Sequence, residues 1–423
     1  MALKRDLRSD ALEIINSAIE SSQVDKTLGP ALKRFRARFG ALETICIAIG
    51  KAAWKMAKVA YEVLDGAIKK GVVITKYGHS EGKIPCFEIY EAGHPLPDEN
   101  SIKATERVID MVKELGPEDH VIFLVSGGGS ALFELPLPGL TLSDIIQISD
   151  KLLKSGADIS EFNTVRKHLS AVKGGRFAQL CYPARVHTFV LSDVIGNRLD
   201  TVASGPAFPD SSTSDEAFKV LEKYGIEITE KIRSALSKET PKSLENVETE
   251  VVGSIELACE TALKKAQELG YNSMLLTTSL TCEAKEAGRF LGAVAREVSA
   301  SDRPLKKPAA VICGGETVVR VTGTGQGGRN QELALSASIE IKGMEGIVLA
   351  SVGTDGTDGP TDAAGGIVDG ETYEKILIST GKKPEEFLKN NDSYNALKAA
   401  NALIITGPTG TNVNDVVLLL VGE

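Results

Sequence analysis

The chain has 423 residues, which is enough for two or three domains at roughly 100–200 residues each. It carries 48 Lys and Arg against 57 Asp and Glu, a formal charge of −9. This balance disfavours nucleic-acid binding, which requires many phosphates to be neutralised, and adsorption to an anionic membrane. Glycine supplies 41 residues, above the average share of roughly 7%, so many positions use unusual backbone freedom.

The cysteines and the N-terminus indicate a reducing compartment. The six cysteines form no CxxC pair and no zinc-ligand spacing, which favours a reduced, cytoplasmic protein. We expect no signal or transit peptide, because the first ten residues are charged and an amphipathic helical pattern follows. No apolar run reaches the 18 or so residues of a membrane span. We therefore expect neither nucleic acid nor membrane as a partner, and a homodimer stays an open option.

Short apolar runs alternate with helical patterns along the whole chain, which is typical of an α/β protein with a largely parallel sheet. In the first half we predict strands at 44–49, 71–75, 86–92, 120–126 and 186–192. Helices are predicted between them at 51–68, 99–114, 142–155 and 163–180. In the second half we predict strands at 248–253, 273–279, 308–313, 318–323, 346–353, 402–407 and 416–421. The helices there are predicted at 255–269, 282–300, 329–341 and 393–400.

A polar, charged stretch at 210–246 separates the two series, so we place the domain boundary near 235–247. We expect residues 1–240 to form a Rossmann-like domain with a mostly parallel sheet and flanking helices. Residues 241–423 would form a second α/β domain.

Lys51 follows the strand at 44–49 and opens a helix. A helix N-terminus carries positive potential, so a lysine there is unfavourable unless it meets an anion such as phosphate or carboxylate. The alternative is an ordinary solvated surface lysine. We favour the anion-binding interpretation.

A glycine-rich loop follows the strand at 120–126 and comprises Ser126, Gly127, Gly128, Gly129 and Ser130. Consecutive glycines allow the backbone to curl around an anion, and the serines add hydroxyl donors. The alternative is a flexible loop, but linkers seldom follow directly on a buried strand.

Asp193 ends the next predicted strand and begins a loop that also holds Asn197, Asp200 and Asp210. A carboxylate at a strand end beside phosphate-binding loops suits a Mg²⁺ ligand or a general base. An Asp that caps a turn is an equally good local interpretation.

A second glycine-rich loop contains Gly323, Gly325, Gly327 and Gly328 between a predicted strand and a helix. Its GxGxxG spacing is a literal dinucleotide fingerprint, and Asp355 lies where a ribose-binding carboxylate would be. A NAD-dependent dehydrogenase is therefore an open alternative.

Two features of this half favour phosphoryl transfer instead. Arg329 follows the glycines directly, and the acidic loop holds Asp355, Asp358 and Asp362, more carboxylates than one ribose needs. In phosphoryl transfer, cations meet the developing charge and carboxylates hold Mg²⁺.

A basic patch lies in the predicted helix at 163–180, and it comprises Arg166, Lys167, His168, Lys173 and Arg176. Two glycines at 174–175 interrupt this helix at a cost of about 1 kcal/mol each. We expect a ligand or another backbone to approach closely there.

Together the motifs resemble the type 2 glycerate kinases of the MOFRL family, from about residue 8 to the C-terminus. The segments that carry the resemblance are IAIGKAAWKMA, AGHPLPDENS, LVSGGGSALFELP, NTVRKHLSAVKGGRFA, VLSDVIGN, ASGPAFPD, ICGGETVVRVTGTGQGGRNQELALSA, SVGTDGTDGPTDAAGG and TGPTGTNVNDVVLLLV.

The resemblance implies ATP-dependent phosphorylation of D-glycerate at its 2-hydroxyl, with Mg²⁺, in a cleft between an N-terminal Rossmann-like lobe and a C-terminal MOFRL-type lobe. The family's key lysine, arginine and two aspartates correspond to Lys51, Arg329, Asp193 and Asp355. The two aspartates would bind Mg²⁺ or accept the hydroxyl proton.

The remaining expected roles concern the bound molecules. ATP would contact Ser126, Gly127, Gly128, Gly129, Ser130, Gly325, Gly327 and Gly328. Arg166 or Lys173 would bind the glycerate carboxylate. The alternatives are an NAD(P)H-dependent hydroxypyruvate reductase and an anion-binding protein without turnover.

Overall fold

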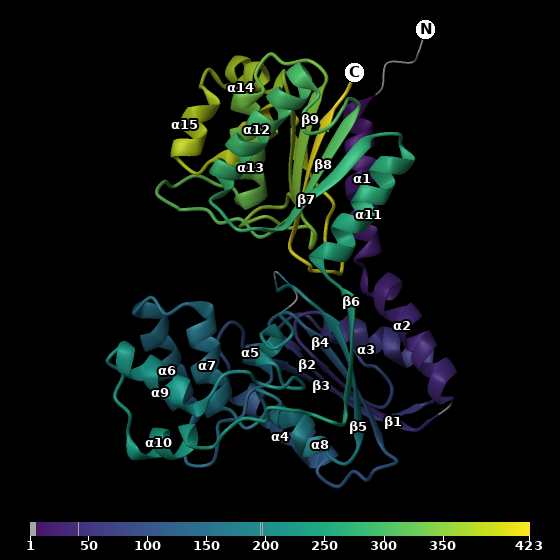
Figure 1. Cartoon of the computed structure of the whole chain (residues 1–423), viewed down its shortest axis with the longest axis vertical. Helices are drawn as coiled ribbons and strands as arrows, with labels where there is room; N and C mark the ends of the chain where they lie inside the picture. The colour runs from purple at the N-terminus through teal and green to yellow at the C-terminus, as the bar shows by residue number, and fades with distance from the viewer. Residues whose placement is uncertain (1–5, 41, 195, 197) are drawn as a thin grey trace. The chain divides into compact units, whose positions relative to one another are not determined.

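The chain forms two compact units in the computed structural model, which describes residues 6–40, 42–194, 196 and 198–423 (Figure 1). The N-terminal unit is Thr27–Val252, and the C-terminal unit is Gly253–Glu423 together with the segment up to Lys26. This division differs from the expected 1–240 and 241–423 in two ways: the first helix belongs to the second unit, and residues 241–252 belong to the first.

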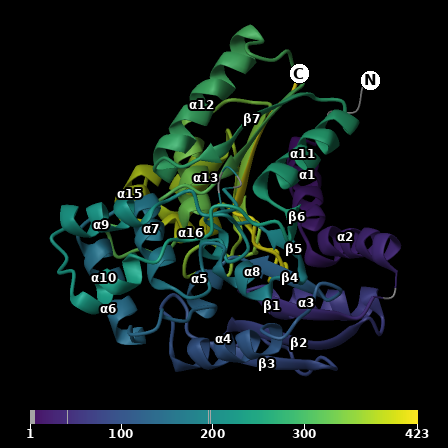
Figure 2. The ribbon, with the colours of Figure 1, turned by 60° about the horizontal axis from the view of Figure 1, so that its bottom comes forward.

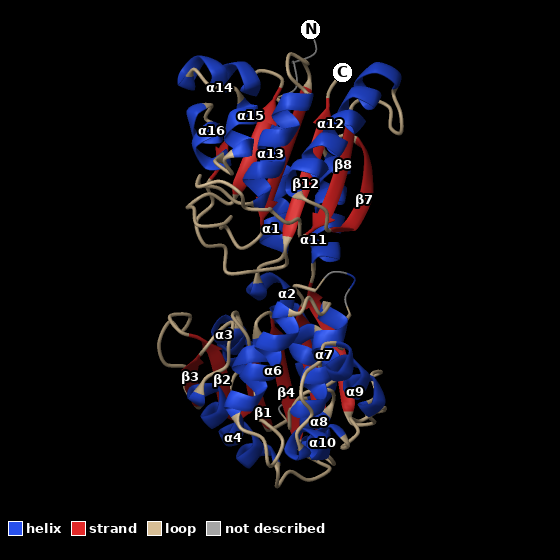
Figure 3. Cartoon of the chain, turned by 90° about the vertical axis from the view of Figure 1, so that its left-hand side faces the viewer, coloured by secondary structure: helices blue, strands red, loops and turns tan. Residues whose placement is uncertain are grey.

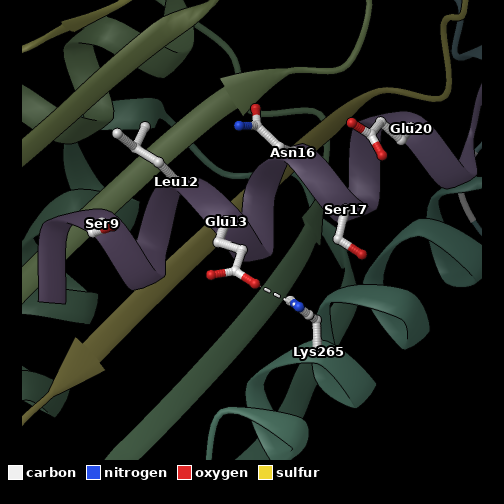
Figure 4. A pocket seen from close by; sticks show the side chains of 7 residues that line it. All are labelled: Ser9, Leu12, Glu13, Asn16, Ser17, Glu20 and Lys265. Carbon is white, nitrogen blue, oxygen red and sulfur yellow. Dashed lines mark ion pairs between the residues drawn. The ribbon is translucent and has the colours of Figure 1, made fainter. Parts of the chain in front are cut away.

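The first helix, α1 (Leu7–Ser21), packs beside α11 (Ile255–Glu268) in the C-terminal unit (Figures 1 and 2). Its apolar face is buried, and the Tyr271 hydroxyl donates to Asp10 Oδ2 at 2.6 Å. A polar pocket between the two helices is crossed by the ion pair of Lys265 and Glu13 (Figure 4). An amphipathic pattern predicts that a face is buried, but not against which sheet.

The sheet of the N-terminal unit has the order β3-β2-β1-β4-β5-β6, and β1 to β5 are parallel. This order confirms the predicted Rossmann-like topology. The strands are β1 (Thr44–Ile49), β2 (Ile68–Lys76), β3 (Phe87–Ala92), β4 (His120–Ser126), β5 (Arg185–Leu191) and β6 (Val247–Gly253). The strand predicted at 248–253 is therefore the edge of this first sheet and does not open the second.

The helices of the N-terminal unit follow the predicted alternation. They are α2 (Val24–Phe39, which begins in the preceding segment), α3 (Ala53–Leu64), α4 (Glu99–Val112), α5 (Gly129–Leu132), α6 (Leu142–Lys154), α7 (Ile159–Leu169), α8 (Arg176–Cys181), α9 (Ser214–Lys223) and α10 (Glu230–Leu236). The helix predicted at 163–180 is split into α7 and α8, because Gly174 and Gly175 adopt φ +56° and +85°.

The sheet of the C-terminal unit has the order β11-β10-β9-β12-β8-β7 and is mixed. Its strands are β7 (Asn272–Leu280), β8 (Ala309–Gly315), β9 (Ile347–Gly353), β10 (Gly365–Asp369), β11 (Leu403–Ile404) and β12 (Asp415–Val421). The fully buried β12 lies between β8 and β9 and is antiparallel to both. Consequently the first residue of β12 lies at the carboxyl ends of its two neighbours.

Helices cover this second sheet, with α12 (Ala284–Ser301) and α13 (Arg329–Glu340) side by side on one face (Figure 3). Besides α1 and α11, the unit also contains α14 (Thr372–Thr380), α15 (Pro384–Lys389) and α16 (Ser393–Ala399). The predicted strand at 318–323 is wrong: the segment is a loop with Val318 and Val321 exposed. Among the described residues, no helix is long and apolar enough to span a bilayer.

Candidate active site

Lys51 follows β1 directly, as the sequence predicts, but it lies in the turn before α3 and does not itself open the helix, which begins at Ala53. Gly50, with φ +114°, makes this turn possible, and a Cβ on it would lie 2.2 Å from Ser126 Oγ. The backbone N–H of Lys51 donates to the carbonyl of Gly127 at 2.8 Å. This hydrogen bond holds the lysine against the glycine loop that follows β4.

The glycines of that loop are surrounded by functional side chains. A Cβ on Gly127 would lie 1.9 Å from the Asp193 carboxylate, and one on Gly128 would meet His94 and Lys51 at 3.1 Å. The structure therefore brings together Lys51, Gly127–Gly129 and Asp193 within the N-terminal unit. His94 joins them, because its ring atoms would lie 3.1 Å from a Cβ on Gly128.

Burial controls the charges in this cluster. It raises the pKa of Asp193 above its ordinary value, an effect that the nearby Lys51 ammonium partly offsets. The pKa of His94 is lowered to about 4, first by burial and then by the positive charges of Lys51, Lys76 and His79. His94 is therefore neutral near pH 7 and presents a hydrogen-bonding imidazole without adding charge.

The serines of the loop are fixed by internal hydrogen bonds. Ser126 Oγ accepts from the N–H of Ala52 and donates to the carbonyl of Ile49, both at 3.1 Å. Ser130 Oγ lies 2.9 Å from Ser204 Oγ, which donates to Asn163 Oδ1 at 3.2 Å. Asn197, which the sequence suggested in the loop after Asp193, lies outside the described residues.

The two residues predicted to bind the glycerate carboxylate differ in their surroundings. Lys173 is fully buried, and its Nζ donates to the carbonyl of Phe133 at 2.7 Å and pairs with Glu134 Oε2 at 2.9 Å. Arg166 is half-buried, with its guanidinium carbon 4.3 Å from the Phe162 ring centroid. Sequence analysis missed Glu134, which is 39 residues away from its partner Lys173.

The rest of the basic patch has structural partners. Arg176 donates to three backbone carbonyls, and Lys167 pairs with Asp200 and Asp210 at 3.2 Å each. The two glycines at 174–175 approach another backbone, because their N–H groups donate to the carbonyls of Ser204 and Gly205.

Arg329 is the first residue of α13 in the C-terminal unit, as predicted. Its Nε and Nη2 donate to the two carboxylate oxygens of Asp415 at 2.6 and 3.0 Å, and Nη1 pairs with Glu316 at 3.1 Å. Burial lowers the pKa of Arg329, but these two carboxylates outweigh it and raise the pKa above its ordinary value. Neither acid was selected from the sequence.

Two aspartates of the acidic loop after β9 have distinct roles. Asp355 is half-buried, and its Oδ1 accepts from the backbone N–H and the hydroxyl of Thr357. Asp358 is buried and accepts from the N–H groups of Asn330 and Gln331 at 3.2 and 2.8 Å, so it caps α13. Burial raises the pKa of Asp358 to about 6.

The second glycine loop packs against the segment 390–393. A Cβ on Gly325 would lie 2.3 Å from Asp392 Cβ, and one on Gly327 would lie 2.1 Å from Ser393 Oγ. One on Gly328 would lie 2.3 Å from Asp358. Side chains at 390–392 accept hydrogen bonds from the backbone N–H groups of residues 322–324 and 326. Most backbone N–H groups of this loop therefore already donate hydrogen bonds within the protein.

Within the part of the chain that the structure describes, no three His, Cys, Asp or Glu residues are placed to hold a metal ion together. Mg²⁺ typically needs only one or two carboxylates besides substrate phosphates. Asp193 supplies one such carboxylate in the N-terminal unit, and Asp355 supplies one in the C-terminal unit. Each of these carboxylates, taken within its own unit, is an oxygen donor of the kind that Mg²⁺ binds together with substrate phosphates.

Comparison with known proteins identifies the family. A domain of unknown function, DUF4147, matches residues 10–237, and the MOFRL family matches residues 309–415. A D-glycerate 2-kinase from Thermotoga maritima is 60% identical over 98% of both chains. The chain belongs to the glycerate 2-kinase family.

Other matches agree with this assignment, which confirms the resemblance seen in the motifs. A glycerate 2-kinase from Pyrococcus horikoshii is 43% identical over 89% of this chain and 86% of its own. The crystal structure of Thermotoga maritima glycerate kinase matches with a TM-score of 0.94 and 59% identity, over 98% of this chain and 99% of that one. A relative from Agrobacterium vitis, 40% identical over 89% of this chain and 87% of its own, carries the name hydroxypyruvate reductase only provisionally.

Proposed function

We propose that this member of the glycerate 2-kinase family transfers the γ-phosphoryl group of ATP to the 2-hydroxyl of D-glycerate. The products are 2-phospho-D-glycerate and ADP. The observation that carries the proposal is the cluster of Lys51, Gly127–Gly129 and Asp193, which places a cation, a curled backbone and a carboxylate at one sheet edge. Phosphoryl transfer requires mainly such positioning and charge stabilisation.

In this proposal Lys51 and Arg329 stabilise the negative charge of the transferring group. Asp193 accepts the proton of the glycerate hydroxyl, because a carboxylate with a raised pKa is a better base near neutral pH. Asp355 then contributes to Mg²⁺ binding, and a bound Mg²⁺ neutralises phosphate charge. Lys51 and Arg329 belong to different units, so their joint action stays a prediction.

The first glycine loop, Ser126–Ser130, is the better candidate for ATP phosphates. Its glycines lie next to Lys51, whereas the N–H groups of the loop at 322–326 already bind the segment 390–392. The second loop therefore supports Arg329 in our proposal. Contact of Gly325, Gly327 and Gly328 with ATP stays a prediction.

Arg166 is the better candidate for the glycerate carboxylate. Lys173 already pairs with Glu134 in a fully buried position, so recruiting it to a substrate would leave a buried carboxylate unpaired. Arg166 is half-buried; Glu134 also attracts its guanidinium, but among the described residues the two form no ion pair within 4 Å. A guanidinium also matches a carboxylate in a two-point geometry.

A pair of assays tests the proposal against the reductase alternative. We expect ADP release that depends on D-glycerate, and no NADH or NADPH oxidation with hydroxypyruvate. Phosphorus NMR of the product should show 2-phosphoglycerate. Formation of 3-phosphoglycerate, or reductase activity without kinase activity, would contradict the proposal. Nucleotide binding without either activity would favour a non-catalytic binding protein.

Location and assembly complete the proposal. All six cysteines are free, which suits a reducing cytoplasm. A homodimer is the assembly we propose to test first, by light scattering of the full chain.

A further inference from the structure

The start of β12 occupies a particular place in the C-terminal sheet. Asp415, its first residue, is paired in register with Gly315 at the end of β8 and with Gly353 at the end of β9. Glu316 and Asp355 follow these two glycines by one and two residues. Antiparallel β12 therefore delivers a carboxylate to the edge where the candidate residues of this unit lie.

The contact between Asp415 and Arg329 has a two-point geometry. Nε and Nη2 donate to separate carboxylate oxygens at 2.6 and 3.0 Å, which fixes the plane of the guanidinium. Glu316 pairs with Nη1 at 3.1 Å from a second direction. A guanidinium has five N–H donors. Two therefore remain for another anion after these three contacts.

The burial of the pair is asymmetric. The Asp415 side chain is 4% exposed, whereas the Arg329 side chain is 34% exposed. The carboxylate is thus the fixed partner and the guanidinium the accessible one. Asp358 does not compete for this role, because it is hydrogen-bonded to backbone N–H groups at the start of α13.

We infer that Asp415 is a positioning residue that orients Arg329 for the transferring phosphoryl group. Glu316 assists it from the other side of the guanidinium. This inference rests on the proposed function for the identity of the anion, but not for the geometry of the pair. Asp415 itself does not touch substrate in this scheme; it acts only through Arg329.

The kinetic test is a double-mutant cycle on the full chain. Asp415→Asn keeps the shape of the side chain but removes its charge, so it weakens the two-point contact with Arg329. We expect kcat to fall about 10²-fold, the scale of a small misplacement of a reacting group. The KM values for ATP and glycerate should change less than about threefold. In an Arg329→Ala background, Asp415→Asn should have no further effect on kcat, because the group it positions is gone.

Glu340→Gln is the matched control. It removes the carboxylate charge of a more exposed arginine–glutamate pair, Arg296 with Glu340 at 2.6 Å, at the opposite end of α13. We expect wild-type kcat from it. Additive losses in the Arg329→Ala and Asp415→Asn double variant would overturn the inference, since Asp415 would then act independently of Arg329.

Guanidinium rescue provides a second readout that a purely structural role would not move. Added guanidinium should restore part of the activity of Arg329→Ala, because Asp415 can hold the free cation. The same addition should restore nothing in Arg329→Ala with Asp415→Ala. Equal rescue of both variants would contradict the positioning role.

A spectroscopic measurement separates this inference from the proposed function. The Nε–H of Arg329, assigned in ¹⁵N-arginine-labelled protein by its loss in Arg329→Lys, should exchange slowly in the wild type and rapidly in Asp415→Asn. This holds whether or not glycerate is the substrate. Unchanged exchange would overturn the inference, and failure of glycerate-dependent ADP release in the wild type would overturn only the proposed function.

Discussion

The two glycine-rich loops look alike in the sequence, but their neighbours differ. In Gly127 and Gly128 the missing Cβ leaves room for Asp193, His94 and Lys51, which are candidate chemical groups. In the loop at 323–328 the missing Cβ atoms leave room mainly for the segment 390–393 of the same unit. A glycine cluster therefore indicates that other atoms lie close to the backbone. Which residues those atoms belong to decides whether the cluster contributes to a ligand site or only to packing.

Each loop nevertheless leads to one cation. Lys51 is held by the first loop through its backbone N–H, and Arg329 follows the second loop at the start of α13. The first loop thus forms part of the candidate phosphate site itself. The second loop contributes indirectly, because it positions Arg329. Variants of the two loops should consequently fail in different ways.

The largest effects should come from the two cations themselves. Lys51→Ala and Arg329→Ala should each lower kcat by about 10²–10³-fold, the usual scale for losing one charge partner of a transition state. Steady-state kinetics of glycerate-dependent ADP release measures this. Lys55→Ala, exposed on α3, is the matched control and should be near wild type. Near-normal turnover in Lys51→Ala would contradict the assignment of Lys51 and the first glycine loop to the active site.

Arg166, in α7, and Lys173, between α7 and α8, should differ in their roles: we expect Lys173 to be structural and Arg166 to bind substrate. Lys173→Met leaves Glu134 buried without its partner and should lower the free energy of unfolding by about 3 kcal/mol. Arg166→Ala should instead raise the KM for glycerate about tenfold, the loss of roughly 1.4 kcal/mol of binding. Urea unfolding and steady-state kinetics measure the two effects.

Adding Glu134→Gln to Lys173→Met tests the buried pair. Much of the lost stability should return, because the unpaired charge is removed. A Lys173→Met variant that keeps its stability and raises the KM for glycerate would reverse the two assignments.

Alanine in the two glycine loops should divide activity from stability. Gly127→Ala displaces the Asp193 carboxylate and should lower kcat/KM about tenfold or more with little change in unfolding. Gly325→Ala pushes on Asp392 and Asn390 and should cost about 1–3 kcal/mol of stability, typical of overpacking. Gly29→Ala is the control, because its Cβ would meet nothing within 4 Å. Equal loss of stability in Gly127→Ala and Gly325→Ala would contradict the proposed difference between the two loops.

The sequence predicts much of the fold because buried parallel strands appear as unbroken apolar runs. The predicted strands at 44–49 and 120–126 coincide with β1 and β4. β10 (Gly365–Asp369) is missed because it is short and begins with two glycines. The antiparallel direction of β12 is invisible in its own sequence, since VVLLLV suits either direction.

The sequence likewise predicts the site residues that have a local pattern and misses those that depend on strand direction. Lys51, Asp193 and Asp355 lie within two residues of the end of a strand, and Arg329 opens a helix directly after a glycine-rich loop; both are local signals. Asp415 is the first residue of its strand, and it is 86 residues away from Arg329. Only the reversed direction of β12 brings it to the same edge, so no local pattern could have selected it.

The smallest predicted effects are opposite responses of the two units to acid. All five histidines lie in the N-terminal unit. Burial and then His120 lower the pKa of His187 to about 4, below its unfolded value of about 6.5. Between these values the unfolded state binds more protons, so the N-terminal unit should lose roughly 2 kcal/mol from this group as the pH falls from about 7 to about 5.

In the C-terminal unit the sign is reversed. Burial raises the pKa of Asp358 to about 6, above its unfolded value of about 3.9. The folded state therefore binds the proton first, and acidification over the same range should add roughly 1 kcal/mol to the stability of this unit. Hydrogen exchange, corrected for intrinsic rates, should show weakening protection in β4 and β5 and strengthening protection in β9 and β12. His187→Gln should weaken the first trend, and the part that remains should include His94, whose pKa is also lowered to about 4. Asp358→Asn should weaken the second trend, and His79→Gln, at an exposed site, should change neither. Parallel trends in the two units would show that other groups dominate, because these two buried residues demand opposite signs.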